Sequence, residues 1–80
     1  MSKIEIRSPL PGTFYRASSP DVPPFKADGD SVAASDAIGL IEVMKTFQEV
    51  PAGVDGKNIT FLVENEEPVM AGQVIAEVEA

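Results

Sequence analysis

The chain contains neither cysteine nor histidine. The absence of cysteine excludes disulfide bonds, a thiol nucleophile and cysteine-based metal sites. The absence of histidine removes the side chain that most often acts as a general base or binds a metal ion near neutral pH. These two gaps argue against self-contained catalysis, and we predict that the chain is not itself an enzyme.

Cationic residues and long apolar runs are also scarce. The chain has 6 Lys and Arg against 13 Asp and Glu, so its formal net charge is -7 at pH 7. An acidic surface repels nucleic acid and anionic membranes, so neither is expected as a partner. No apolar run approaches the roughly 20 residues that a membrane-spanning helix needs, and the N-terminus lacks the pattern of a signal peptide. A cytoplasmic location is therefore expected.

Short strands separated by turns dominate what is present. The chain has 80 residues, 44% of them hydrophobic, with 7 prolines and 6 glycines. This composition suits one small folded domain over residues 1–80, built from short strands. No long stretch keeps the periodicity of a helix. The expected strands lie at residues 4–7, 12–16, 37–43, 46–50, 59–64 and 74–78.

A faint internal repeat relates the two halves of this pattern. Residues 32–38 can be laid over residues 69–75 with an offset of 37, because both read as a valine, small residues, a polar position and an apolar strand. The turn at Gly12 resembles the turn at Gly56 with an offset of 44. The offsets differ by 7 (44 minus 37), and we assign the extra residues to a proline-rich loop near residues 17–24. The repeat predicts a two-fold, all-β scaffold.

Lys45 lies at the junction between the two repeats, in the segment Glu42-Val43-Met44-Lys45-Thr46. A lone lysine is most often a solvated surface residue, and a neighbouring methionine most often fills a gap in a core. If Met44 and Lys45 form a two-residue hairpin loop, however, they replace the Asn-Gly or Asp-Gly that such a turn prefers. A turn without its favoured residues is a place where function can override local propensity. We therefore single out Lys45 as an amine within reach of a modifying enzyme.

This segment resembles a known family. Glu42-Val43-Met44-Lys45 is similar to the Glu-Ala-Met-Lys motif of biotinyl domains, in which the lysine is biotinylated. Residues 8–16 resemble the opening strand of the biotin carboxyl carriers of bacterial acetyl-CoA carboxylases, and residues 62–64 and 68–69 are similar as well. The resemblance covers about residues 4–79. It implies a flattened β-barrel or sandwich of two quasi-symmetric, four-stranded halves.

The loop near residues 17–24 adds a second point of resemblance. In the carriers of acetyl-CoA carboxylases a protruding thumb occupies this place, and Ser19-Pro20-Asp21 resembles its start. The resemblance implies that the loop lies near the prosthetic group and limits its motion. An ordinary proline-rich loop is the alternative interpretation.

The resemblance implies a carrier rather than a catalyst. Biotin would be attached covalently to Lys45 by a biotin protein ligase, for which Glu42, Val43 and Met44 would form the recognition motif. A biotin carboxylase would load the cofactor with a carboxyl group. A carboxyltransferase would pass that group on, as an acetyl-CoA carboxylase does in fatty acid biosynthesis. The tether on Lys45 would act as a swinging arm between these partners.

Three alternatives stay open. The chain could serve another biotin-dependent carboxylase or a decarboxylase. It could be a lipoyl domain, although those usually place an acidic residue just before the target lysine, where Met44 stands here. It could also be an unmodified interaction domain. Three residues depart from the family pattern: Val43 replaces the usual alanine, Thr46 replaces methionine or leucine, and Asn58 replaces an apolar residue. Val43 and Thr46, next to the target lysine, are the reason the last alternative stays open.

Acidic residues gather near one expected turn, at Glu64, Glu66 and Glu67, while Glu42 and Glu49 flank the lysine. Carboxylates act as a general acid and base only where they converge with suitable pKa values, which usually requires burial. These residues occur in polar turn contexts, so we interpret most of them as solvated charges that keep a small domain soluble. No catalytic pair and no metal site is expected.

Overall fold

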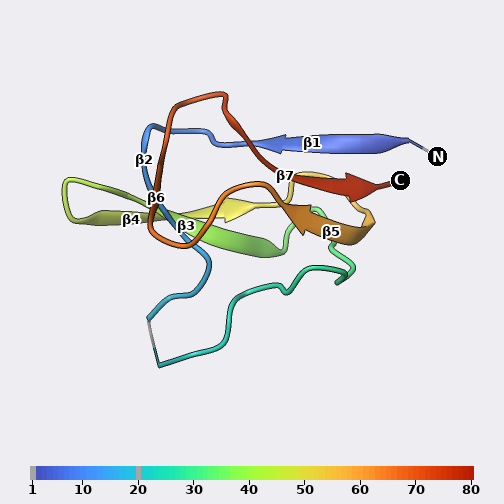
Figure 1. Ribbon diagram of the computed structural model, residues 1–80, viewed down its shortest axis with the longest axis horizontal. Coiled ribbons are helices and arrows are strands. Elements are labelled where there is room, and N and C mark those ends of the chain that lie inside the picture. Colours follow the sequence, from blue (N-terminus) through green and yellow to red (C-terminus); the bar gives the residue numbers. More distant parts are fainter. Residues whose placement is uncertain (1, 20) are drawn as a thin grey trace.

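The computed structural model describes residues 2–19 and 21–80, which fold into two antiparallel β-sheets (Figure 1). The three-stranded sheet has the order β1 (Lys3–Arg7), β7 (Val74–Glu79), β5 (Lys57–Phe61). The four-stranded sheet has the order β4 (Thr46–Pro51), β3 (Ala37–Val43), β2 (Gly12–Tyr15), β6 (Glu67–Val69). The described residues include no helix long and apolar enough to cross a membrane. The predicted all-β sandwich is confirmed.

The two sheets repeat each other in strand order. With the offsets of 37 and about 44, β7 corresponds to β3, β5 to β2 and β1 to β4. Val32 takes the place of β6 beside β5, because its N–H donates to the Gly56 carbonyl at 2.8 Å and its carbonyl accepts from the Gly56 N–H at 3.0 Å. The order β1-β7-β5-Val32 therefore matches β4-β3-β2-β6. The two predicted halves are present, with one of their strand positions reduced to a single bridge.

Matching turns lead into β3 and β7. Asp36 Oδ2 accepts from the Ala33 N–H at 3.0 Å, and Gln73 Oε1 accepts from the Met70 N–H at 2.9 Å. The Asp36 N–H also donates to the Ala33 carbonyl at 2.9 Å, and the Gln73 N–H donates to the Met70 carbonyl at 3.1 Å. Side chains that bond nearby backbone in this way are typical turn formers. The repeat is therefore one of hydrogen bonding as well as of sequence.

The core fills the space between the sheets. Because side chains alternate along a strand, Phe14, Ile41 and Ile75 point inward and are fully buried. Burying one such side chain stabilises the fold by about 1.5–3 kcal/mol. The whole buried cluster comprises Ile6, Phe14, Val32, Ile38, Ile41, Val50, Ala52, Ile59, Val63, Val69, Ile75, Ala76 and Val78. Both repeats contribute to this cluster, so neither half of the chain has a core of its own.

Two strands differ from the sequence prediction. The sequence predicts a strand over residues 59–64, whereas β5 begins at Lys57 and ends at Phe61. β6 has no counterpart in the prediction because Pro68 lies in its middle. Pro68 pairs with Thr13 of β2. Because β6 is the edge strand of its sheet, the missing N–H of Pro68 is tolerated there.

The backbone explains one departure from the family pattern. Asn58 has a φ of 56°, and its side-chain Nδ2 donates to Glu79 Oε2 at 2.9 Å. Asn tolerates the left-handed region better than the apolar residues usual at this position. Asn58 therefore serves the local backbone of β5.

A long excursion between β2 and Val32 breaks the two-fold pattern (Figure 1). The Phe25 N–H donates to the Arg16 carbonyl at 2.9 Å and closes the base of this excursion. The Arg16 guanidinium lies over the Phe61 ring, 4.1 Å from its centroid, and so ties the base to β5. An insertion at the predicted place is confirmed. Pro20, which is part of the thumb resemblance, lies outside the described residues.

Candidate functional site

The β3–β4 hairpin ends in a two-residue loop formed by Met44 and Lys45. Val43 and Thr46 are the last pair of the ladder, and φ is 51° at Met44 and 66° at Lys45. Positive φ at both central positions is the requirement of a type I′ turn, which Asn and Gly meet most easily. For other residues the left-handed conformation costs about 1–2 kcal/mol each. The predicted hairpin is confirmed, and its loop is strained.

The hairpin loop lies at the end of the molecule away from both termini (Figure 1). Met44 is 92% exposed, and Lys45 is exposed as well. Within the described part of the chain, none of the ion pairs involves Lys45. The ladder behind the loop holds a primary amine out in solvent, where an external reagent can reach it.

Tyr15, Glu42 and Phe47 meet on three adjacent strands next to this hairpin, and we call them the Tyr15 cluster. Glu42 pairs with Phe47 across β3 and β4. The Tyr15 hydroxyl donates to Glu42 Oε1 at 3.0 Å, and the Tyr15 and Phe47 ring centroids are 6.0 Å apart. The hydrogen bond to Glu42, followed by partial burial and by the charges of Glu42 and Glu66, raises the pKa of Tyr15 above its ordinary value of 10.0.

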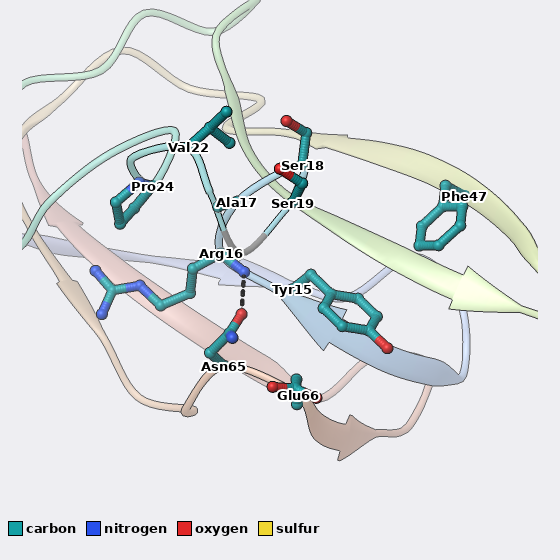
Figure 2. A pocket seen from close by; sticks show the side chains of 10 residues that line it. All are labelled: Tyr15, Arg16, Ala17, Ser18, Ser19, Val22, Pro24, Phe47, Asn65 and Glu66. Atoms are coloured by element: carbon teal, nitrogen blue, oxygen red, sulfur yellow. Dashed lines mark hydrogen bonds between the residues drawn. The ribbon is translucent and has the colours of Figure 1, made fainter.

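A groove of about 500 Å³ opens between the excursion and the four-stranded sheet (Figure 2). Asn65 Oδ1, in the turn between β5 and β6, accepts from the Arg16 N–H at 2.8 Å and so links that turn to the start of the excursion. The Arg16 guanidinium points away from Tyr15 and Phe47. Tyr15 and Phe47 line the end of the groove nearer the hairpin, so that end is aromatic. The lining residues are Tyr15, Arg16, Ala17, Ser18, Ser19, Val22, Pro24, Phe47, Asn65 and Glu66.

The turn carboxylates have separate local roles. Glu67 Oε1 accepts from the Glu64 N–H at 2.9 Å and closes the turn. Glu66 is exposed, has a φ of 65° and lines the groove. Glu49 is exposed on β4. Residues 2–19 and 21–80 contain no group of His, Cys, Asp or Glu side chains arranged to hold a metal ion.

The four residues singled out from the sequence lie together at one end of β3, but their side chains point in different directions. They are Glu42, Val43, Met44 and Lys45. Met44 and Lys45 are exposed, and Glu42 joins the Tyr15 cluster. Val43 is half-buried and packs against the core. A Cβ added at Gly12 would lie 3.0 Å from Val43 Cγ2, so β2 and the hairpin are in close contact here.

Sequence reasoning missed Tyr15 and Phe47 as neighbours of the site. Their contact crosses β3 and depends on the register of three strands, which the sequence does not specify. The one available signal was alternation. Because Phe14 points into the core, Tyr15 must point to the opposite face.

Comparison with known proteins identifies the family. Residues 4–78 match the biotin–lipoyl family model, which is described as "Biotin-requiring enzyme". The chain is 47% identical over 68 residues to the biotin carboxyl carrier protein of acetyl-CoA carboxylase from Streptococcus pyogenes, an alignment that covers 85% of this chain and 41% of that protein. It is 44% identical over 64 residues to the protein of the same name from Pseudomonas aeruginosa, covering 80% and 41%.

A solved structure gives the same result for the fold. The urea carboxylase of Kluyveromyces lactis matches with a TM-score of 0.75 and 30% identity, over 98% of this chain and 6% of that one. The chain spans about two fifths of the length of the curated relatives it matches. The family match nonetheless covers both sheets and the Lys45 hairpin. The chain belongs to the biotin–lipoyl family of biotin-requiring enzymes.

Proposed function

We propose that the chain is a biotin carboxyl carrier domain and that Lys45 carries the biotin. The supporting observation is an exposed primary amine in a strained two-residue turn, in a chain of the biotin–lipoyl family. A turn with only a structural role would be more stable with Asn-Gly than with Met-Lys. A requirement for lysine at this position accounts for the strain.

The surroundings of Lys45 suit a covalently attached acyl group. In the attachment step, the deprotonated Lys45 Nζ would attack the carboxyl carbon of the group, activated by the ligase as its adenylate. An amide forms, AMP leaves, and the lysine loses its positive charge. Because no described carboxylate is within ion-pair distance of Lys45, this loss breaks no ion pair. The chain has no histidine to act as a base, so we expect the modifying ligase to remove the proton.

The chain supplies position and reach to the attached group. Biotin supplies the ureido nitrogen that accepts and releases a carboxyl group. The β3–β4 ladder, from the Ala37–Pro51 pair to the Val43–Thr46 pair, holds the base of the tether. Tethering of this kind gives an effective concentration of about millimolar at a partner that it can reach.

The proposed partners are a biotin protein ligase, a biotin carboxylase and a carboxyltransferase. The name shared by the relatives supports an acetyl-CoA carboxylase, and thus fatty acid biosynthesis. We assign ligase recognition to Glu42, Val43 and Met44 because they lead directly into Lys45. A single carrier domain over residues 1–80 and a cytoplasmic location belong to the same proposal.

A second candidate function is favoured by the structural match. The chain resembles a small part of urea carboxylase, so it could be the carrier segment of a carboxylase with another acceptor. The two candidates share Lys45 and biotin and differ in the carboxyltransferase that discharges the carrier.

Carboxyl transfer tests the proposal. The biotinylated chain is incubated with a purified biotin carboxylase, ATP and labelled bicarbonate. We expect label on the wild-type chain and none on Lys45→Arg. Discharge by an acetyl-CoA carboxyltransferase with acetyl-CoA supports the first candidate, and discharge only by a urea-specific enzyme supports the second. A biotinylated chain that no carboxylase labels would contradict carrier function.

A further inference from the structure

Tyr15 lies beside the hairpin without belonging to it. It pairs with Leu40 in the β2–β3 ladder, and its side chain lies on the face of the sheet opposite to the core. There it contacts Glu42 on β3, at 3.0 Å from hydroxyl to Oε1, and Phe47 on β4, at 6.0 Å between ring centroids. One side chain thus links β2 to both strands of the hairpin that presents Lys45.

Glu42 is held by this contact through only one of its oxygens. Oε1 accepts the Tyr15 hydroxyl, and no second hydrogen bond to the Glu42 carboxylate is present among the described residues. None of the ion pairs in residues 2–19 and 21–80 involves Glu42 either. Oε2 is therefore available to an external donor, and a cationic side chain makes the strongest hydrogen bond to a carboxylate.

We infer that Tyr15 is a positioning residue for biotinylation, whose hydroxyl fixes the Glu42 carboxylate for a cationic group of the biotin ligase. This inference rests on the proposed function, because it takes Lys45 as the target of that ligase. A glutamate that is already fixed loses less side-chain freedom when the partner binds. Phe47 packs against the Tyr15 ring and limits its movement.

The protonation state of Tyr15 agrees with this role. Its pKa is raised above 10.0, mainly by the hydrogen bond to Glu42, so the phenol keeps its proton throughout the neutral range. The hydroxyl is therefore the donor of this bond across the pH range in which a ligase works.

Steady-state kinetics of a biotin ligase acting on the unmodified chain test the inference. Tyr15→Phe removes the hydroxyl and keeps the ring on Phe47. We expect the KM for the chain to rise about threefold to tenfold with kcat unchanged, the range expected when binding must itself order one side chain. In a Glu42→Ala background, Tyr15→Phe should cause no further rise.

Thr13→Val is the matched control. Thr13 lies on the same strand directly opposite Glu42, and this variant also removes one hydroxyl while leaving the Tyr15–Glu42 bond intact. Its KM should equal that of the wild type. An unchanged KM in Tyr15→Phe, an equal rise in Thr13→Val, or a full rise in the Glu42→Ala background would each overturn the inference. A wild-type chain that no biotin ligase modifies would instead overturn the proposed function, and the inference with it.

Discussion

Val43 and Thr46 face each other at the end of the β3–β4 ladder, with only Met44 and Lys45 between them. Both intervening residues have positive φ, a conformation that disfavours side chains other than Asn and Gly. The stability of the hairpin therefore favours Asn-Gly at these two positions, whereas the proposed modification requires a lysine at the second. Such a conflict is common where function and stability act on the same positions.

Met44→Asn should stabilise the chain. Asn tolerates a φ near 51°, and Met44 is 92% exposed, so little packing is lost. We expect the free energy of unfolding in urea to rise by about 0.5–1 kcal/mol. Met44→Leu keeps the strain and should leave stability unchanged. No gain with Asn, or an equal gain with Leu, would show that the turn is not strained at this position.

The repeat made much of the fold predictable. The offset that relates Val32 to Val69 also relates β3 to β7, because two copies of one pattern form the same turn and strand. β6 escaped prediction because a proline in a strand normally argues against it, and only its position at a sheet edge permits Pro68. Of the candidate site, Lys45 and its turn followed from local sequence. The Tyr15–Glu42 bond did not, since it depends on strand register.

Gly39→Ala should destabilise the chain through a steric clash. An added Cβ would lie 2.5 Å from Phe14 Cε1 and 2.7 Å from the Tyr15 carbonyl oxygen. Phe14 is fully buried and cannot move aside without disturbing the core. We expect a loss of about 2–3 kcal/mol in the free energy of unfolding.

The matched control for this prediction is Gly53→Asn. Gly53 has a φ of 75° and open space around its Cα, and Asn tolerates that conformation. Its free energy of unfolding should change by less than about 0.5 kcal/mol. Equal losses in the two variants would contradict close packing between β2 and β3 as the cause.

Asp36 should contribute stability that depends on pH. The Ala33 N–H and, after it, Lys26, whose Nζ lies 3.1 Å from Oδ2, hold the pKa of Asp36 below its ordinary value of 3.8. Because the folded pKa is the lower one, the contribution is present above 3.8 and is lost as the pH falls through the folded value. Asp36→Asn should therefore melt below the wild type at pH 7.

The difference in melting temperature between Asp36→Asn and the wild type should shrink as the pH falls below 3.8. Asp21→Asn, at an exposed loop position, should melt like the wild type at both pH values. A gap for Asp36→Asn that persists unchanged at low pH would assign its effect to packing rather than to charge.

Tyr15 should titrate above the ordinary value for a tyrosine. It is the only tyrosine and the chain has no tryptophan, so ultraviolet absorbance of the phenolate reports Tyr15 alone. We expect a midpoint above 10.0. Glu42→Gln removes the neighbouring charge and should move the midpoint toward 10.0, whereas Glu49→Gln should not. Equal shifts in the two variants would mean that the pKa of Tyr15 responds to the overall negative charge of the surface and not to its bond to Glu42.

The central claim is that Lys45 is the attachment point, and intact mass spectrometry tests it most directly. The chain is co-expressed with a biotin ligase, and its intact mass is measured beside those of the Lys45→Arg and Lys57→Arg variants expressed in the same way. We predict one biotin-sized increase in mass in the wild type and in Lys57→Arg, and none in Lys45→Arg. A lipoyl-sized increase, no increase with any ligase, or a biotin-sized increase that survives in Lys45→Arg would contradict the claim.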